Sequence, residues 1–463
     1  MGQRKRQNAT SRAKYLLFAL PFILAYVSWV WFPVLAEYVI RWGFGYVPMF
    51  QAAHWLWYLT VGFLYTWYTF LAIGIGGSFV VAAWLWKQRK THVKVRDYPA
   101  VSFIVPAYNE EKVISRCITS LFRCAANCLG PSEIIVVDDG STDHTYEVAW
   151  ATIEVNRRLW PRISGKVVRH TTNLGKAEAV RTGVNKAMGE VLSTVDADSW
   201  WDPATLTELV NYMNAEDKTG VTGYIHPSNG NSERNLYVIL QQLEYSQGLG
   251  IFRCAQALGN AVLVVPGPIG LYEANALRNI LNEKILRSVT EDLEITLEMQ
   301  KRGLSVGYVG QARSSTIAPA SFGFLWDQRL RWFIGGLHNM LGIHRDMLFN
   351  RRWLSLLLWY CLIIGYGGAI LELIAVFGAP LLFLFAPDRL FFLFNLALFL
   401  PYAFLIGIVC QAIALKFSYN QFNHRRLLFY TPLYTVLRFI NVCARFVCLI
   451  KYSLGKRGTW HKS

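Results

Sequence analysis

Two aspartate pairs, each directly after a short apolar run, carry the clearest chemical signal in the sequence. Asp138 and Asp139 follow the run at 134–137. Two carboxylates at the end of a buried strand can accept hydrogen bonds from a base N–H and from ribose hydroxyls, so this pair suits a nucleoside. The same residues also suit an Asp-Gly turn capped by an aspartate, and taken alone the turn is the simpler interpretation.

Asp196 and Asp198 form the second pair, after the apolar run at 191–195. Residues i and i+2 of an extended chain point to the same side, so their carboxylates can converge on one divalent cation. Mg²⁺ and Mn²⁺ prefer oxygen ligands and share their remaining positions with phosphates and water. Because Asp-x-Asp is a common tripeptide, the pair predicts a metal site only in company with other motifs.

Two further motifs lie on expected helices. Glu291 and Asp292 enter a helix, where a carboxylate could deprotonate an acceptor hydroxyl or simply complement the helix dipole. In the motif Gln-Arg-Leu-Arg-Trp, the side chains of Gln328, Arg331 and Trp332 share one helix face. A guanidinium can hold a diphosphate through two parallel hydrogen bonds, and an indole offers a flat surface to a sugar ring. A snorkelling interfacial helix is the alternative.

The region at 97–315 must position these motifs. Short apolar runs alternate there with helix-like stretches, which predicts an α/β domain with a mostly parallel sheet covered on both faces. Ligands bind such sheets at the carboxyl ends of the strands, where the motifs lie. The expected strands are 101–105, 134–137, 167–170, 191–195, 221–225 and 261–265, and the expected helices are 111–127, 177–188, 202–214 and 290–303.

Long apolar segments on both sides of this region predict a membrane protein. Only 16% of the residues are charged, against about a quarter in a soluble domain. The segments 15–40, 55–86, 353–386, 390–415 and 427–450 all exceed the ~20 residues that cross a bilayer. Basic residues flank them and account for much of the +16 net charge, which places the central domain in the cytoplasm and argues against nucleic-acid binding.

Two segments suit the membrane interface. Residues 321–347 are rich in aromatics and interrupted by charge, as in an interfacial helix. Segment 427–450 contains Arg438 and Arg445 and has basic residues at both ends, so its topology stays open between a span, an interfacial helix and a re-entrant segment.

Taken together, the motifs resemble those of processive family 2 glycosyltransferases, most closely bacterial poly-N-acetylglucosamine synthases, with hyaluronan and chitin synthases next. Residues 106–110 resemble the family's first nucleotide-binding turn, 173–176 the segment that brings a lysine to the nucleotide, and 259–270 its acceptor-side loop. The resemblance covers nearly the whole chain. No segment after residue 332 resembles the cyclic-di-GMP-binding domain of bacterial cellulose synthases, and this argues against a cellulose synthase.

The resemblance implies a GT-A-type α/β domain inserted between transmembrane α-helices, with interfacial helices. It divides the chain into a basic cytoplasmic tail (1–14), two transmembrane helices (15–90), the GT-A domain (97–315), interfacial helices (316–350), C-terminal transmembrane helices (353–450) and a basic tail (451–463).

It also implies the function of each candidate residue. The residues expected to bind the nucleotide-sugar are Tyr108, Glu110, Asp138, Asp139, Lys176, Asp196, Gln328 and Arg331. Asp292 would be the base, with Glu291 beside it in the catalytic pair. Asp198 would ligate Mg²⁺ or Mn²⁺, and Trp332 would hold the acceptor terminus.

The expected activity is a processive, inverting polymerisation of a UDP-sugar, best matched by UDP-GlcNAc, into a β-linked polysaccharide that crosses the cell membrane. The expected partners are the UDP-sugar, the growing polymer and the bilayer, with an accessory membrane or export protein left open. The alternatives are a hyaluronan, chitin or cellulose-like synthase, a non-processive transferase acting on a lipid-linked acceptor, and a non-catalytic transporter or scaffold. The donor sugar and the linkage are not determined by the motifs.

Overall fold

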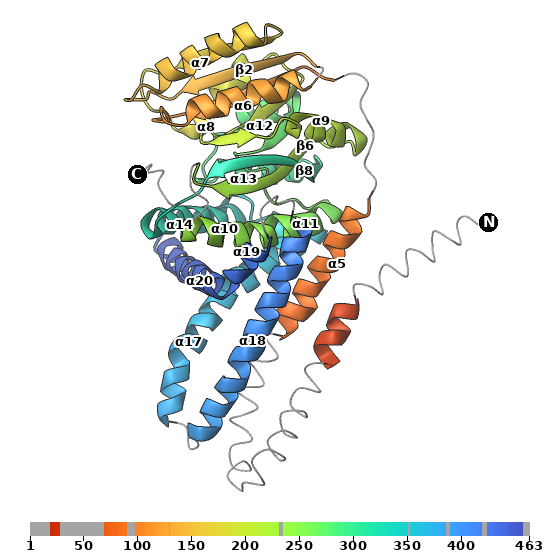
Figure 1. Ribbon diagram of the computed structural model, residues 1–463, viewed down its shortest axis with the longest axis vertical. Helices are drawn as coiled ribbons and strands as arrows, with labels where there is room; N and C mark the ends of the chain where they lie inside the picture. The colour runs from red at the N-terminus through yellow and green to blue at the C-terminus, as the bar shows by residue number, and fades with distance from the viewer. Residues whose placement is uncertain are drawn as a thin grey trace, which may run out of the picture.

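One eight-stranded sheet, in the order β3-β2-β1-β4-β7-β6-β8-β5, forms the centre of the α/β domain (Figure 1). The computed structural model describes residues 19–27, 69–89, 98–128, 130–230, 235–350, 352–385, 389–418 and 424–456. The strands are β1 Val101–Ala107, β2 Ser132–Asp138, β3 Ile163–Arg169, β4 Val191–Thr194, β5 Ser199–Trp201, β6 Gly220–Ser228, β7 Gly270–Glu273 and β8 Val306–Ile317. All seven residues of β1 and of β2 are buried, as expected of central strands covered on both faces.

The expected, mostly parallel sheet is confirmed, with two antiparallel strands within it. Strands β3, β2, β1 and β4 are parallel neighbours, and β6 pairs with β8 in parallel. Strand β7 runs antiparallel to β4 and β6, and β5 runs antiparallel to β8. The parallel run matters most for function, because the carboxyl ends of β1, β2 and β4 meet at one edge.

The expected strand at 261–265 is wrong, since these residues pair with no strand. The segment is apolar and buried, but side chains rather than a neighbouring strand satisfy its backbone. The N–H of Leu263 donates to Gln256, and that of Val265 donates to Thr296. The apolar run therefore predicted burial of this segment correctly, but it predicted the wrong secondary structure.

Helices cover both faces of the sheet and bury one continuous apolar core. Helices α6, α7 and α9 pack on one face, and α8 and α12 pack on the other. These five helices are α6 Ile114–Ala126, α7 Thr145–Leu159, α8 Lys176–Lys186, α9 Thr205–Ala215 and α12 Ala274–Glu283, and a sixth helix of the domain is α13 Glu291–Lys301. Helices α6, α8, α9 and α13 confirm the expected ones, with starts and ends shifted by a few residues.

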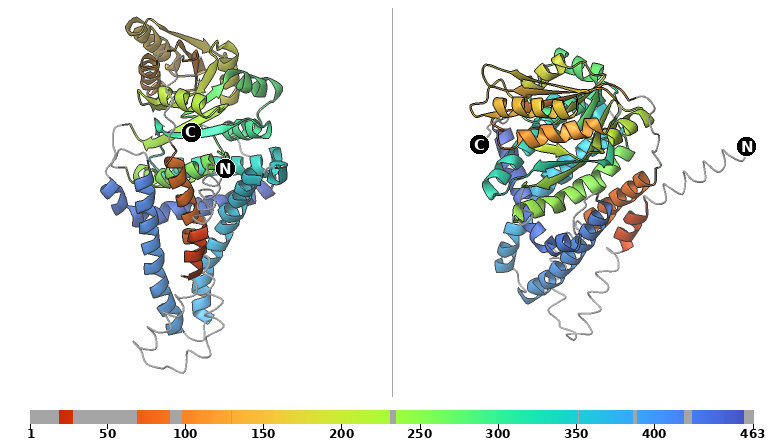
Figure 2. Two further views of the ribbon diagram at one scale, coloured as in Figure 1. Left: turned by 90° about the vertical axis from the view of Figure 1, so that its right-hand side faces the viewer. Right: turned by 45° about the horizontal axis from the view of Figure 1, so that its top comes forward.

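A layer of helices lies beneath the α/β domain (Figure 1). It contains α10 Leu236–Gln247, η3 Gly248–Phe252, α11 Arg253–Leu258, α14 Phe322–Leu337, η4 His338–Ile343, α15 Met347–Asn350, α19 His424–Phe429 and α20 Thr431–Ser453. Helix α20 packs along α14 and α10, and Figure 2 shows it lying across α17 and α18. This orientation matches the interfacial alternative that the charge pattern left open for segment 427–450.

Further helical segments project away from this layer (Figure 1). They are η2 Phe70–Ile75, α5 Gly76–Lys87, α16 Arg352–Tyr360, η5 Cys361–Gly367, α17 Gly368–Phe385 and α18 Arg389–Phe417. Within the described residues, four helical stretches have the length and composition to cross a membrane: Phe70–Lys87, Trp353–Gly378, Leu400–Phe417 and Thr431–Ser453. Most of the expected span at 15–40, and both basic tails apart from residues 451–456, lie outside the described residues.

Candidate active site

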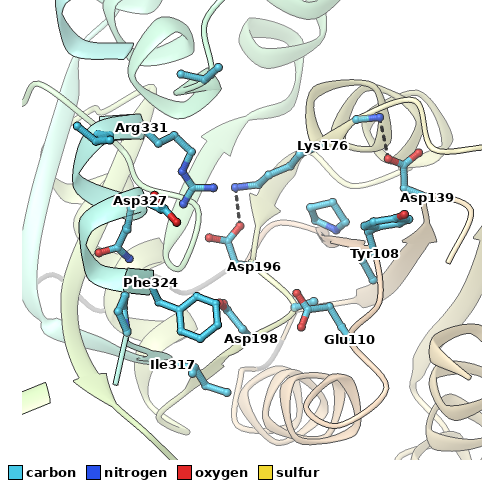
Figure 3. Close-up of a pocket in the computed structure, with 18 of the residues that line it drawn as sticks. Tyr108, Glu110, Asp139, Lys176, Asp196, Asp198, Ile317, Phe324, Asp327 and Arg331 are labelled. Atoms are coloured by element: carbon cyan, nitrogen blue, oxygen red, sulfur yellow. Dashed lines mark hydrogen bonds and ion pairs between the residues drawn. The ribbon is translucent and has the colours of Figure 1, made fainter. Parts of the chain in front are cut away.

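A cleft of ≈ 1070 Å³ opens at the carboxyl ends of β1, β2 and β4 and is bounded on its other side by α14 (Figure 3). It brings together eight of the residues expected from the sequence: Tyr108, Glu110, Asp139, Lys176, Asp196, Asp198, Gln328 and Arg331. Four expected residues are not among those that line it: Asp138, Glu291, Asp292 and Trp332.

The turn after β1 is fastened to the turn after β2. The backbone N–H of Asn109 donates to Ser141 Oγ over 2.9 Å, and that of Glu110 donates to Thr145 Oγ1 over 2.7 Å. In return, Asn109 Oδ1 accepts from the N–H of Thr142. These bonds explain the polar residues after Asp139, and they hold Tyr108 and Glu110 at the cleft.

Asp139 fixes a third loop beside this double turn. Its two carboxylate oxygens accept the N–H groups of Leu174 and Gly175 at 2.9 and 2.8 Å, and His170 Nδ1 lies 2.7 Å from it. Gly140 makes this approach possible, because its φ is +70° and a Cβ there would lie 2.6 Å from the backbone of Thr172. Asp139 therefore both lines the cleft and sets the start of α8, which delivers Lys176.

Asp138 lies behind this turn and is fully buried. Its carboxylate pairs with Arg169 Nε at 3.0 Å and accepts the N–H of Ser141. The position corresponds to the turn-capping alternative for the first aspartate. Its contribution to nucleotide binding stays a prediction.

Lys176 links the two acidic motifs. Its Nζ lies 2.7 Å from Asp196 Oδ1 and 2.6 Å from Glu291 Oε1 (Figure 3 shows the first of these ion pairs). Although burial alone would lower it, the two carboxylates hold the pKa of Lys176 well above its usual value. Asp196 is further confined by Gly267, where a Cβ would lie 2.4 Å from its carboxylate.

Asp198 lies in an environment that favours a cation. Burial and the nearby carboxylates of Asp196 and Glu110 raise its pKa to about 7, because three acidic groups cannot all ionise cheaply without positive charge. In the described part of the chain, no three His, Cys, Asp or Glu residues are arranged to hold a metal ion unaided. Oxygen donors of this kind fit Mg²⁺ or Mn²⁺ held jointly by one or two carboxylates and the phosphates of a substrate.

Asp292 lies at the first turn of α13, next to the Lys176–Glu291 pair. Burial and the neighbouring Glu291 raise its pKa to about 6. A carboxylate with that pKa is ionised at neutral pH and is a stronger base than an ordinary aspartate. The pKa of Asp292 and its position next to the Lys176–Glu291 pair suit proton abstraction beside the cleft.

The face of α14 that lines the cleft begins before the Gln-Arg-Leu-Arg-Trp motif. Phe324, Asp327, Gln328 and Arg331 all line the cleft (Figure 3), and their i, i+3, i+4 and i+7 spacing could have identified the first two from sequence. Trp332 shares this face only in part. Its ring lies 4.5 Å from the guanidinium carbon of Arg329 rather than among the residues that line the cleft.

Arg329, to which the sequence assigned no function, is the largest fully buried side chain in the described residues. Its Nη2 pairs with Glu244 on α10, and Glu244 also accepts from Asn441 on α20 over 2.7 Å. The guanidinium therefore ties three helices of the layer together while it stacks on Trp332. No spacing rule signals such a network, since Glu244 lies 85 positions before Arg329 and Asn441 lies 112 positions after it.

Two lysines of the C-terminal segment also reach the cleft. Lys451 lies in the last turn of α20, and the N–H of Lys456 donates to the carbonyl of Lys451. Gly455, with a φ of +78°, allows that reversal. The sequence interpretation used these basic residues only as a signal of membrane orientation.

The central region of the chain is similar to known proteins. Residues 102–281 match the family model described as glycosyl transferase family 2. The match contains the residues of β1, β2 and β4 that form the cleft and ends before Glu291, Asp292 and α14. The assignments in those later elements therefore depend on their own geometry.

Two curated proteins illustrate the relatives. The chain is 26% identical to a poly-beta-1,6-N-acetyl-D-glucosamine synthase of Staphylococcus aureus over 255 residues, which are 55% of this chain and 58% of that protein. It is 30% identical to an N-acetylglucosaminyltransferase of Azorhizobium caulinodans over 244 residues, which are 50% of this chain and 59% of that protein. The matched region thus spans less than two thirds of either relative.

A solved structure shares the fold. A mannosyltransferase from Pyrobaculum calidifontis, in complex with GDP-Man and Mn²⁺, superposes with a TM-score of 0.59 over 84% of this chain and 97% of its own. The sequence identity is 17%, so the likeness concerns the fold alone.

Proposed function

We propose that this chain, which carries a glycosyl transferase family 2 domain over residues 102–281, is a processive, inverting membrane glycosyltransferase. Its donor would be UDP-GlcNAc and its product a β-linked polysaccharide. One observation carries the proposal: a single cleft brings a nucleotide-binding double turn, an Asp-x-Asp pair and the Gln328–Arg331 face of α14 together beside Asp292. Such a combination suits transfer from a nucleoside diphosphate to a hydroxyl.

Each side of the cleft would bind one part of the donor. Tyr108, Glu110 and Asp139 lie on the side that suits the uridine, and Arg331 lies across the cleft from them (Figure 3). Gln328 lines the cleft from the same helix as Arg331, and a diphosphate could accept hydrogen bonds from both side chains. Asp196 and Asp198 would hold Mg²⁺ or Mn²⁺, which neutralises the leaving diphosphate when bound. Lys176 would orient Asp196 and add positive charge beside the phosphates.

Asp292 would act on the acceptor. As the acceptor hydroxyl attacks the anomeric carbon, its proton passes to Asp292, the new C–O bond forms, and the bond to the diphosphate breaks to release UDP. Attack opposite to the leaving group inverts the α-linked donor to a β linkage. Trp332, one turn from Gln328, would support the acceptor terminus.

The membrane proposal follows from the helices. Four described stretches are apolar and long enough to span a bilayer. One of them is α20, which lies with α10 and α14 in the layer between the other three stretches and the α/β domain (Figure 1). We place this layer at the cytoplasmic interface, with the catalytic domain at 97–315 in the cytoplasm. A polymer leaving the cleft would then meet the spanning helices directly.

The choice of donor draws on the two curated relatives, both of which are named for N-acetylglucosamine. To test it, purified protein in detergent is given UDP-GlcNAc, UDP-GlcA, UDP-Glc or UDP-Gal singly, and UDP-GlcNAc with UDP-GlcA, each with Mg²⁺ or Mn²⁺. UDP release and a high-mass product with UDP-GlcNAc alone are the expected result. A strict need for both UDP-GlcNAc and UDP-GlcA would replace the proposal with a hyaluronan synthase, and short, single-sugar products would remove processivity.

A further inference from the structure

We propose that Asn339 is a positioning residue that fixes the Glu291–Asp292 turn relative to the cleft face of α14. The proposal rests on the function proposed above and assigns one more residue to it. Asn339 lies outside the Gln-Arg-Leu-Arg-Trp motif, in the short π-helix η4 that continues α14. It touches neither the cleft nor the catalytic carboxylates, so any influence on the reaction must pass through the turn.

The side-chain amide of Asn339 is fully buried and points at the turn that precedes α13. Its Nδ2 lies 2.8 Å from Ser288 Oγ, 3.1 Å from Thr290 Oγ1 and 3.0 Å from the carbonyl oxygen of Gly335, so its two hydrogens are shared among these three acceptors. Thr290 directly precedes Glu291. One amide group therefore joins the end of α14 to the residue before the catalytic pair.

The turn itself has little freedom to move. Ser288 Oγ lies 2.9 Å from Thr290 Oγ1 and accepts the N–H of Thr290. On the opposite side, Gly335 packs so closely that a Cβ there would lie 2.5 Å from Thr290 Oγ1. The hydroxyl of Thr290 is thus held between α14, η4 and its own turn.

The surroundings of Asn339 make an amide an unexpected choice. Ile334, Leu337 and Met340 belong to a buried apolar cluster against which Val289 and Leu293 pack. A leucine of similar size would suit such a place, whereas Asn339 leaves its Oδ1 without a hydrogen-bond partner among the described residues. An amide with one unsatisfied polar atom in an apolar site lowers the stability of the fold. We infer that this cost is offset because the amide orients the turn that carries Glu291 and Asp292.

The geometry explains what that orientation does. Arg331 on α14 and Asn339 on η4 are eight positions apart, about 12 Å along a helix. The continuous helix formed by α14 and η4 therefore carries both the diphosphate-binding face and, about two turns further on, the anchor of the base. The base and the phosphates must be held at a fixed separation for transfer. A misplacement of ~1 Å can slow a reaction ~100-fold.

The test compares Asn339→Leu with Asn156→Leu in the full-length protein. Asn156 is a matched control, because it is also buried and donates both to the carbonyl four residues earlier and to a threonine hydroxyl of another helix, but on α7. We expect Asn339→Leu to lower kcat for UDP release at least about tenfold and to leave the donor KM and the UDP Kd within about twofold. Asn156→Leu should leave all three unchanged.

A second pair of variants addresses the partner. Thr290→Ser keeps the hydroxyl and should retain most of kcat, whereas Thr290→Val removes it and should behave like Asn339→Leu. Hydrogen–deuterium exchange without donor should show faster exchange at residues 286–292 in Asn339→Leu and in Thr290→Val, but not in the control.

Two results would overturn the proposal: a wild-type kcat with unchanged exchange in Asn339→Leu, or a parallel loss of kcat, UDP affinity and melting temperature in both leucine variants. If wild-type protein releases UDP from no donor, the proposed function fails. Exchange at residues 286–292 then still decides whether Asn339 fixes the turn.

Discussion

The ammonium nitrogen of Lys176 lies 2.6 Å from a carboxylate oxygen of Glu291. This contact joins the start of α8 to the start of α13, and the second contact of the same nitrogen, with Asp196, extends the link to the end of β4. Because Glu291 is paired with a lysine, the proposed proton acceptor of the two carboxylates is Asp292. We therefore expect Glu291 to hold Lys176 and Asp292 to act as the base.

Asp292→Asn tests that difference. The amide keeps the shape of the side chain and cannot accept the proton, so we expect UDP release to fall by about 10²–10⁴-fold while UDP binding stays within about twofold. Glu291→Gln is the companion variant. It removes a partner of Lys176 and should weaken donor binding as well as turnover. Near-normal polymer yield from Asp292→Asn would remove this residue as the base.

The pH dependence of kcat provides a separate test of Asp292. Its pKa is raised to about 6, and the base works only when ionised, so activity should be full above pH 7 and fall as the pH drops through 6. Below that midpoint, kcat should decrease about tenfold per pH unit. The measurement is made at saturating donor and Mg²⁺, so that the acidic side of the pH profile reports the ionisation of Asp292 alone. A midpoint near pH 4, the usual range of an aspartate, would contradict the buried environment described here.

Those parts of the site that depend on neighbouring residues in the chain could be predicted from sequence. Asp139, Asp196 and Asp198 follow strands that the apolar runs identified, and parallel strands bring their carboxyl ends together whatever the details of packing. The same local pattern could not separate Asp138 from Asp139. One carboxylate turns inward to Arg169, and the other turns toward the cleft.

The parts that the sequence did not reveal depend on docking between distant elements. Lys451 reaches the cleft only because α20 packs along α14, and Trp332 lies against Arg329 because Glu244 holds that guanidinium from α10. Similarly, the run at 261–265 has the composition of a strand, but Gln256 and Thr296 satisfy its backbone in place of a sheet. A pattern of apolar residues predicts that a segment is buried. It does not predict the element against which the segment packs.

Gly267→Ala should damage the Asp-x-Asp end of the cleft. The added methyl group would lie 2.4 Å from the carboxylate of Asp196, and the backbone of the two residues is hydrogen-bonded, so Asp196 or the loop must move. We expect a loss of at least about tenfold in kcat/KM for the donor, on the basis of the displaced charge. Gly323→Ala on α14 is the control, since a methyl group there would meet nothing within 4 Å. Equal activity of the two variants would argue against a confined Asp196.

Arg329 should contribute to stability more than any other residue of its motif. Glu244→Gln removes the charge that pairs with a fully buried guanidinium, and breaking one partner of such a pair costs about 3 kcal/mol. Replacement of both residues by apolar ones, as in Arg329→Met with Glu244→Leu, should restore part of that loss. The measurement is the melting temperature in detergent. Acceptor extension by the double variant should remain impaired if the guanidinium also orients Trp332.

Metal removal tests the carboxylate cluster directly. The pKa of Asp198 is raised to about 7 by burial and by Asp196 and Glu110, which indicates negative charge that a divalent cation would stabilise. EDTA should therefore abolish UDP release, and Mg²⁺ or Mn²⁺ in excess should restore it. Asp198→Asn should raise the metal concentration needed for half-maximal activity at least about tenfold, with the fold unchanged by circular dichroism. Full activity in EDTA would remove the metal from the proposal and leave the basic side chains that line the cleft, Lys176, Arg331, Lys451 and Lys456, to balance the charge of the diphosphate.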